Sequence, residues 1–207
     1  MNKIRVIIVD GLILFFVSTV LVVVADMGFS KLKGKTPKDD PIVTAIVQGN
    51  AAGLAELVKP GVSVTEKADG HGRTALMRAA YANIDADKLR DETDGKRAPM
   101  IQLLVSNGAR IDAKDNDGWT SLMWAAWSNL PKVAAVLIEN GASPAAADKH
   151  GNTALILAAR RGNVEIVRLL ATTGDAKAAL EQAKTGLAEY PEKKAAYHAI
   201  IPMLEKK

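Results

Sequence analysis

An internal repeat of 33 residues constrains the fold of this 207-residue chain more than any other feature. Three segments align without gaps: GRTALMRAA at 72–80, GWTSLMWAA at 118–126 and GNTALILAA at 151–159. The last two begin 33 positions apart, and a second landmark keeps the same interval: Gly108, Gly141 and Gly174. Because two independent landmarks share one period, the chain is predicted to be a stack of similar structural units.

Each unit carries the pattern of two helices joined by a turn. A threonine (Thr74, Thr120 or Thr153) stands where a helix N-cap belongs, since its hydroxyl accepts an otherwise unpaired backbone amide. The Leu and Ala-Ala that follow recur at helical spacing and form one apolar face, on which alanine lets a neighbouring helix pack closely. The periodic glycines favour the αL conformation that ends a helix. Second helices are predicted at 100–105, 132–138 and 164–170.

The repeat resembles that of the ankyrin family, whose units are about 33 residues long and carry the motif T-P-L-H-x-A. Residues 120–125, TSLMWA, and 153–158, TALILA, are similar to this motif, with a small residue in place of Pro and Met or Ile in place of His. The polar stretches 115–118 and 148–151 match the projecting turns of the family. The resemblance covers residues 41–174 and implies an all-α solenoid of helix pairs with short hairpin turns.

The resemblance divides residues 41–174 into four units. The first is degenerate and resembles an N-terminal capping repeat, whereas residues 175–207 are expected to form a C-terminal helical cap with a polar outer face. The second unit exceeds the period by 13 residues near 83–97, where a loop between its two helices is expected. Such loops often serve binding, but a tolerated, solvated insertion is equally compatible with the sequence.

A single apolar run precedes the repeats, from Val6 to Ala25, interrupted only by Asp10. About 20 helical residues cross a bilayer core, so residues 1–27 are predicted to form a transmembrane signal-anchor, followed by a flexible linker at 28–40. A cleaved signal peptide is the alternative, although its apolar region usually runs only about 7–15 residues. Because basic residues flank both ends, the orientation is ambiguous. A short cationic start favours a single-pass protein of a bacterial inner membrane with periplasmic repeats; a soluble periplasmic or a cytoplasm-facing protein are the alternatives.

The ankyrin resemblance also implies a partner-binding surface, because such stacks use their turn tips and the exposed side of their first helices as a concave groove. Carried over by position, this surface holds His71, Arg73, Tyr81, Asn116, Asp117, Trp119, Trp127, Lys149, His150, Asn152, Arg160 and Arg161. Trp119 and Trp127 are expected to face the groove, with Trp124 packed partly against a neighbour. Trp, Tyr and Arg dominate interface hot spots. The alternative is that these rings only pack onto adjacent repeats.

The sequence carries no pattern for catalysis or for binding a cofactor. It has no cysteine, and His71, His150 and His198 lack the spacing of metal ligands. It has no nucleophile elbow and no phosphate-binding glycine loop. Its net charge of +4 is not concentrated in the basic stripe that nucleic acid binding needs. The prediction is a monomeric, non-enzymatic module without cofactor or metal that binds a protein partner. The alternative is an exported accessory protein that supports an enzyme by handling a ligand such as a metal or haem.

Overall fold

The computed structural model of the chain divides into two compact units, Met1–Thr36 and Pro37–Lys207. In the first unit the structure describes the backbone of three strands. In the second it describes residues 40–59, 69–81, 87–172 and 176–206, without the side chains of 87–92. Each unit is considered by itself.

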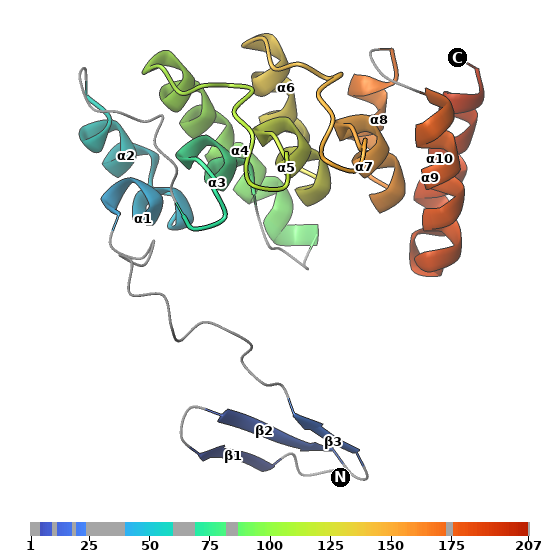
Figure 1. Ribbon diagram of the computed structural model, residues 1–207, viewed down its shortest axis with the longest axis horizontal. Coiled ribbons are helices and arrows are strands. Elements are labelled where there is room, and N and C mark those ends of the chain that lie inside the picture. Colours follow the sequence, from blue (N-terminus) through green and yellow to red (C-terminus); the bar gives the residue numbers. More distant parts are fainter. Residues whose placement is uncertain are drawn as a thin grey trace. The chain divides into compact units, whose positions relative to one another are not determined.

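Every regular element in the described part of the second unit is a helix (Figure 1). In chain order these are α1 (Pro41–Val47), α2 (Ala51–Leu57), α3 (Ala75–Ala80), α4 (Asp87–Ser106), α5 (Ser121–Ser128), α6 (Pro131–Glu139), α7 (Ala154–Arg161), α8 (Val164–Leu170), α9 (Ala176–Glu189), the short 3₁₀ helix η2 (Pro191–Lys193) and α10 (Lys194–Glu205). Figure 1 shows the helix pairs following one another in a row from α1 to α10.

The helices form two layers. In one layer α1, α3, α5, α7 and α9 each pack on the next, and in the other α2, α4, α6, α8 and α10 do the same. The segments that begin at Gly118 and Gly151 therefore lie side by side in equivalent positions, as α5 and α7 with their preceding turns. The predicted all-α repeat solenoid is confirmed for this unit.

The predicted helix caps are present in each repeat. The hydroxyls of the cap threonines accept the backbone N–H of the third helical residue: Thr74 from Met77 at 3.3 Å, Thr120 from Met123 at 3.4 Å and Thr153 from Ile156 at 3.4 Å. At the other end of the units, Gly108 and Gly141 adopt φ of +86° and +89°. Only glycine takes this conformation without steric cost, which explains the glycine at this repeat position. Gly174 lies outside the described residues.

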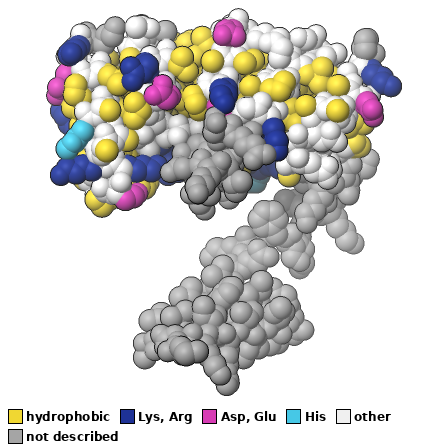
Figure 2. All heavy atoms as spheres, turned by 180° about the vertical axis from the view of Figure 1, so that it is seen from behind, with side chains coloured by type: hydrophobic (Ala, Val, Ile, Leu, Met, Phe, Trp, Pro, Cys, Tyr) yellow, Lys and Arg dark blue, Asp and Glu magenta, His cyan; other side chains and the backbone are white. Residues whose placement is uncertain are grey.

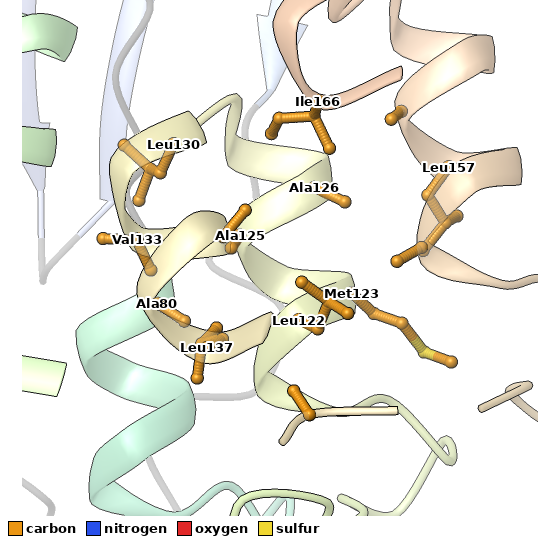
Figure 3. Close-up of a cluster of buried hydrophobic side chains, with 14 of the residues drawn as sticks. Ala80, Leu122, Met123, Ala125, Ala126, Leu130, Val133, Leu137, Leu157 and Ile166 are labelled. Carbon is orange, nitrogen blue, oxygen red and sulfur yellow. The ribbon is translucent and has the colours of Figure 1, made fainter. Parts of the chain in front are cut away.

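One cluster of buried hydrophobic residues extends from α1 to α10, and Figure 3 shows a part of it. All three Ala-Ala pairs are fully buried: Ala79, Ala80, Ala125, Ala126, Ala158 and Ala159. In Figure 3, Leu122 and Met123 of α5 gather with Leu130, Val133 and Leu137 around α6 and with Leu157 of α7. Truncating such a fully buried leucine to alanine costs about 2–5 kcal/mol, so this shared core dominates the stability of the stack.

Buried polar groups also tie each repeat to the next. The Nδ2 of buried Asn163, which precedes α8, donates to the carbonyl oxygen of Ala126 at the end of α5 over 2.6 Å. On the outer layer, the side-chain amides of Gln102 and Asn140 bond each other at 3.0 Å. An unpaired carbonyl at a buried helix end is unfavourable, so Asn163 stabilises the junction between these repeats.

The 13-residue surplus does not form the loop expected between the two helices of the second repeat. From Asp87 onward it is helical and extends α4 at its N-terminal end. The buried Asp94 carboxylate accepts the backbone N–H of Lys132 and Val133 at 2.8 and 2.9 Å, capping α6 of the next repeat. The Arg97 guanidinium donates to the carbonyls of Arg78 and Ala79, at the end of α3. The prediction of a loop is therefore wrong for 87–97, because helix ends on both sides supply partners for the added turns; 83–86 lie outside the described residues.

The C-terminal helices cover the last repeat, with α9 on α7 and α10 on α8. Tyr197 of α10 is the largest fully buried side chain among the described residues, and its hydroxyl donates to the carbonyl oxygen of Arg160 over 2.7 Å. Close approach of α9 to α7 needs Gly186, because a Cβ there would lie 2.4 Å from the Arg160 oxygen and 2.5 Å from the Tyr197 hydroxyl. The close packing of the cap on the last repeat therefore depends on this tyrosine and this glycine.

The first unit contains three short strands, β1 (Arg5–Val9), β2 (Leu12–Val17) and β3 (Val20–Val23). They pair antiparallel in the order β1-β2-β3, with Val9 opposite Leu12 and Val17 opposite Val20. The transmembrane helix predicted over residues 1–27 is thus not shown. The side chains of this segment and residues 28–39 of the predicted linker lie outside what the structure describes. Among the described residues, no helix has the length and apolar character needed to cross a bilayer.

Candidate functional site

Three aspartates organise the turns that precede α3, α5 and α7. Each accepts two backbone N–H groups with one carboxylate oxygen: Asp69 from His71 and Arg73, Asp115 from Asp117 and Trp119, and Asp148 from His150 and Asn152. Aspartate favours such turns because its short side chain bonds backbone amides two to four residues on. These bonds therefore fix the backbone conformation of the turns and so the positions of the residues at their tips.

Neighbouring turns are bonded to each other as well. The N–H of Asn116 donates to the carbonyl of His71 at 2.9 Å, and its Nδ2 donates to Gly70 at 3.1 Å. One repeat further, the N–H of Lys149 donates to the carbonyl of Asp117 at 3.2 Å. These bonds fix the spacing of exposed turn residues across three repeats.

Beside the turns, four aromatic rings form a continuous contact across α3 and α5. Tyr81 and Trp124 meet edge to face with ring centroids 5.1 Å apart, Trp124 and Trp119 lie at 4.6 Å, and Trp119 and Trp127 at 5.7 Å. Such geometries are attractive between ring quadrupoles. All four rings are partly buried, so each keeps surface open to solvent, and the three tryptophans also pack against the core.

Two arginines contact these rings. The Arg161 guanidinium lies 4.5 Å from the last ring, Trp127, and 5.7 Å from the ring of Tyr190, which stands between α9 and η2. Arg73 lies 5.9 Å from the second ring, Trp124. We call the seven residues the aromatic strip: Arg73, Tyr81, Trp124, Trp119, Trp127, Arg161 and Tyr190. The strip joins two repeats, the end of a third and the C-terminal cap into one surface.

The middle repeat differs from the others in what its turn aspartate holds. The second oxygen of Asp115 accepts the indole N–H of Trp124 at 3.0 Å. The equivalent oxygen of Asp69 pairs with the Nε of Arg73 at 2.6 Å, and that of Asp148 accepts the side-chain amide of Asn152 at 3.0 Å. Of the three turn aspartates, only Asp115 therefore holds an aromatic ring, the Trp124 indole within the aromatic strip.

Burial and hydrogen bonding shift several pKa values around this surface. Burial alone would raise the pKa of Asp148, but hydrogen bonds from Asn152 and His150 outweigh it and hold that pKa below its usual value. Burial, with a smaller contribution from the nearby Tyr190, raises the pKa of Tyr197 to about 12, although the charge of Arg161 opposes this shift. Burial lowers the pKa of the Arg78 guanidinium, and the charge of Arg73 adds to this effect.

The predicted partner-binding residues divide into two groups in the structure. The turn tips and the end of α7 expose His71, Asn116, Asp117, Lys149, His150 and Arg160. The partly buried group is Arg73, Tyr81, Trp119, Trp127, Asn152 and Arg161. All of the second group except Asn152 belong to the aromatic strip. The Asn152 amide bonds both oxygens of Asp148, at 3.3 and 3.0 Å, so this side chain is used within its own turn.

The structure adds Trp124 and Tyr190 to the surface that the sequence predicts. Trp124 was expected to pack against a neighbour, and it does, but it also connects Tyr81 to Trp119 as the second ring of the strip. Tyr190 lies beyond the last periodic unit, so no repeat offset predicts its position. Its neighbour Lys193 lies 5.9 Å from the same ring and donates to the carbonyl of Arg161 at 3.1 Å.

The described residues contain no group of three or more His, Asp or Glu side chains arranged to hold a metal ion. Most of the described cations near the strip are paired with acids. Asp69 pairs with Arg73 at 2.6 Å and with Arg78 at 3.9 Å, and Glu189 pairs with Arg160 at 3.3 Å. The surface is thus aromatic with balanced charge, rather than a basic patch.

Comparison with known protein families agrees with the arrangement of helices. Two family models match the chain: ankyrin repeats (3 copies) over residues 93–148 and ankyrin repeats (many copies) over residues 131–171. Residues 93–171 are therefore similar to ankyrin repeats. Ankyrin repeats are in general protein–protein interaction modules and are typically non-catalytic. No curated protein matches the chain.

Proposed function

We propose that this chain is a non-catalytic, membrane-tethered ankyrin-repeat protein that binds a protein partner through the aromatic strip and the adjoining turns. The observation that supports this site most directly is the continuous contact of Tyr81, Trp124, Trp119 and Trp127, with Arg161 stacked on its end. Residues of these three types supply most of the binding energy in protein interfaces.

The geometry of the strip suits binding for an entropic reason. The rings already contact one another, and Trp124 is fixed by Asp115, so few rotamers remain to be ordered when a partner arrives. The turns beside the strip are bonded across three repeats and add exposed polar groups at Asn116, Lys149 and His150. An apolar centre with a polar rim is the usual composition of an interface.

The site is tested by capturing the partner in the native host with a photo-crosslinking residue at Asn116 or His150, and then comparing variants of the full chain. Trp119→Ala and Trp127→Ala are expected to reduce capture about tenfold or more, since hot-spot truncations cost about 2 kcal/mol or more. The matched control is Leu169→Ala, because Leu169 is an exposed apolar residue on α8, in the other layer. Normal capture by both tryptophan variants, with unchanged circular dichroism, would reject this site.

The tether is proposed from the sequence. Residues 1–27 contain an apolar run from Val6 to Ala25 that is long enough for a helix to cross a bilayer, with one charge, Asp10, near its start. We place the chain in a bacterial inner membrane as a single-pass protein with periplasmic repeats. Membrane retention after alkaline extraction, and digestion of the repeats by protease added to spheroplasts, are the expected results. A mature N-terminus after Ala25 would support a cleaved signal peptide instead.

We further propose that the chain is monomeric. The repeat row ends on the pair α1 and α2 on one side and on the pair α9 and α10 on the other, so neither end of the core needs a second chain to cover it. Light scattering of the detergent-solubilised protein should give the mass of one chain after correction for bound detergent. A concentration-independent dimer would contradict this.

A further inference from the structure

Arg161 differs from the other described arginines that lie beside the aromatic strip. Arg73 and Arg78 pair with Asp69, and Arg160 pairs with Glu189. The Arg161 guanidinium, by contrast, makes no hydrogen bond or ion pair with any of the residues that the structure describes. Among the described residues it instead makes cation–π contacts, with the Trp127 ring at 4.5 Å and the Tyr190 ring at 5.7 Å.

The two rings hold the Arg161 guanidinium in place, while its N–H groups have no partner among the described residues. Stacking on two rings fixes the plane of a guanidinium without occupying its N–H groups, because cation–π contact uses the face of the group and hydrogen bonds use its edge. A planar fork of donors fits a carboxylate in a bidentate pair. An arginine with free donors, held next to two aromatic rings, is therefore pre-organised for an acidic group that arrives beside an apolar one.

We propose that the partner segment bound at the aromatic strip is acidic, with a carboxylate that pairs with Arg161 and a neighbouring apolar side chain that packs on Trp127 and Trp119. This inference rests on the proposed function and adds to it the chemistry of the partner. Lys193, which donates to the Arg161 carbonyl, lies 5.9 Å from the Tyr190 ring and brings a second positive charge close to it.

A polyanion such as a nucleic acid or an anionic membrane fits this surface less well. Phosphate backbones and lipid headgroups are bound by many cations acting together, whereas Arg73, Arg78 and Arg160 are already paired with acids. Exposed Asp117 and Glu189 also lie among the residues of the surface. The face seen in Figure 2, viewed from behind Figure 1, also shows charges of both signs scattered among apolar side chains and no basic block. One unpaired guanidinium next to rings matches one carboxylate better than a row of phosphates.

The test is a selection of displayed random peptides against the detergent-solubilised full chain, repeated with Arg161→Gln. The expected result is enrichment of peptides that combine Asp or Glu with an adjacent aliphatic or aromatic residue. Arg161→Gln should weaken binding of those peptides about tenfold, as expected for loss of a charge-assisted pair, and Arg161→Lys should restore part of it. Arg168→Gln is the matched control, because Arg168 is an exposed arginine of α8 paired with Glu165 at 3.7 Å.

Affinity can be measured by intrinsic fluorescence, because the three tryptophans of the chain all lie in the aromatic strip. Enrichment of neutral or basic peptides, equal enrichment with Arg161→Gln, or no enrichment at all would overturn the proposal. Stronger binding of phosphatidylserine vesicles or single-stranded DNA than of any selected peptide, abolished by Arg161→Gln, would also overturn it.

Failure of this inference is distinguishable from failure of the proposed function. If Trp127→Ala loses the crosslinked native partner while Arg161→Gln keeps it at full strength, the strip is the binding site but the acidic partner is wrong. If Arg161→Gln and Trp127→Ala both lose it, and circular dichroism is unchanged for both, the two proposals stand together. If neither variant loses it, the proposed binding site itself is wrong.

Discussion

The periodic repeats between Gly118 and Leu170 and the C-terminal cap between Ala176 and Glu205 are both helix pairs in the same two layers, but they are stabilised differently. In the repeats, small devices recur: a turn aspartate, a cap threonine and a buried Ala-Ala pair. In the cap, a single close contact joins Tyr197 to Gly186 and the Arg160 carbonyl, and no periodic device repeats it.

The repeats should tolerate replacement of a surface side chain more readily than the cap. Each repeat is stabilised by several weak hydrogen bonds and by its Ala-Ala pair. One side chain on its surface can therefore be replaced without unfolding the repeat. The second oxygen of the turn aspartate accordingly holds Trp124 in one repeat and Asn152 in the next. In the cap, Tyr197, Gly186 and the Arg160 carbonyl meet in one very close contact, which leaves little room for substitution at these positions. The two regions should therefore respond to mutation in opposite ways.

The largest effect is expected from Gly186→Ala in the cap. A Cβ at this position would lie 2.4 Å from the Arg160 carbonyl oxygen and 2.5 Å from the Tyr197 hydroxyl, and the first of these is backbone that cannot rotate away. Separation of α9 from α7 should lower the free energy of unfolding by about 3 kcal/mol or more, measured by urea denaturation.

The control for this substitution is Gly70→Ala, because nothing lies within 4 Å of a Cβ added at Gly70. That variant is expected to change stability by less than about 0.5 kcal/mol. Equal midpoints for the two variants would mean that the cap is not held by this contact, and the contrast with the repeats would disappear.

The next effect concerns the turn aspartates. Asp115→Ala removes acceptors for two backbone N–H groups and for the Trp124 indole, whereas Asp148→Ala removes acceptors for two backbone N–H groups and for the Asn152 amide. Each should lower stability by about 2 kcal/mol, since bonds to a charged acceptor are lost from partly buried groups.

The two aspartate variants are distinguished by spectroscopy. Only Asp115→Ala should shift the tryptophan emission maximum, because it releases the ring at the centre of the aromatic strip. An identical emission spectrum for both variants would show that Asp115 does not orient Trp124, which would make the turns of the two repeats equivalent.

The sequence predicts the features that recur in the repeats better than the single contact of the C-terminal cap. Helix caps, the Ala-Ala core and the stacking order follow from the 33-residue period, because a repeated environment selects the same residue type each time. The contact between Tyr197 and Gly186 occurs once and joins residues from different helices. No spacing rule predicts such a contact, so the sequence indicated only that the cap is helical.

The candidate site was predictable in part for a related reason. Trp119 and Trp127 occupy repeat positions whose direction is known from the resemblance, and both lie in the strip. Tyr190 stands outside the period, and the Trp124 indole bond depends on a turn geometry that the sequence does not encode locally. The inserted turns of α4 were mistaken for a loop, because the buried roles of Asp94 and Arg97 require partners from neighbouring repeats.

Tyr197→Phe should have a smaller effect at neutral pH, about 1.5 kcal/mol, because the buried Arg160 carbonyl loses its donor. Its effect depends on pH. The folded chain raises the pKa of Tyr197 to about 12, above the ordinary value of about 10 in the unfolded chain. The stabilisation is therefore complete below pH 10 and is lost as the pH rises from 10 towards 12, by about 1.4 kcal/mol per pH unit.

The measurement for Tyr197 is urea denaturation of the wild type and Tyr197→Phe between pH 9 and about pH 11.5, within the window that the pKa values set. The free-energy difference between them should shrink as the pH rises above 10 and change sign near pH 11, where the loss of about 1.4 kcal/mol per pH unit exceeds the initial difference of about 1.5 kcal/mol, since only the wild type has this phenol to ionise. Lysines titrate in the same range in both proteins and cancel in the difference. Parallel curves would exclude a raised pKa for this tyrosine.

The smallest effect is expected for the cap threonines of the repeats. Thr153→Ala removes the bond from the Ile156 N–H, 3.4 Å long, and should lower stability by about 1 kcal/mol; Thr120→Ala should do the same in the preceding repeat. Because the repeats share their stabilising devices, the double variant should lose about the sum of the two, measured by the same urea denaturation. Replacement by serine should retain most of the stability, since serine supplies the same hydroxyl. A double variant that loses much more than the sum would show that α5 and α7 depend on each other as closely as α9 and α10 do, and the division between shared and concentrated stabilisation would then not hold.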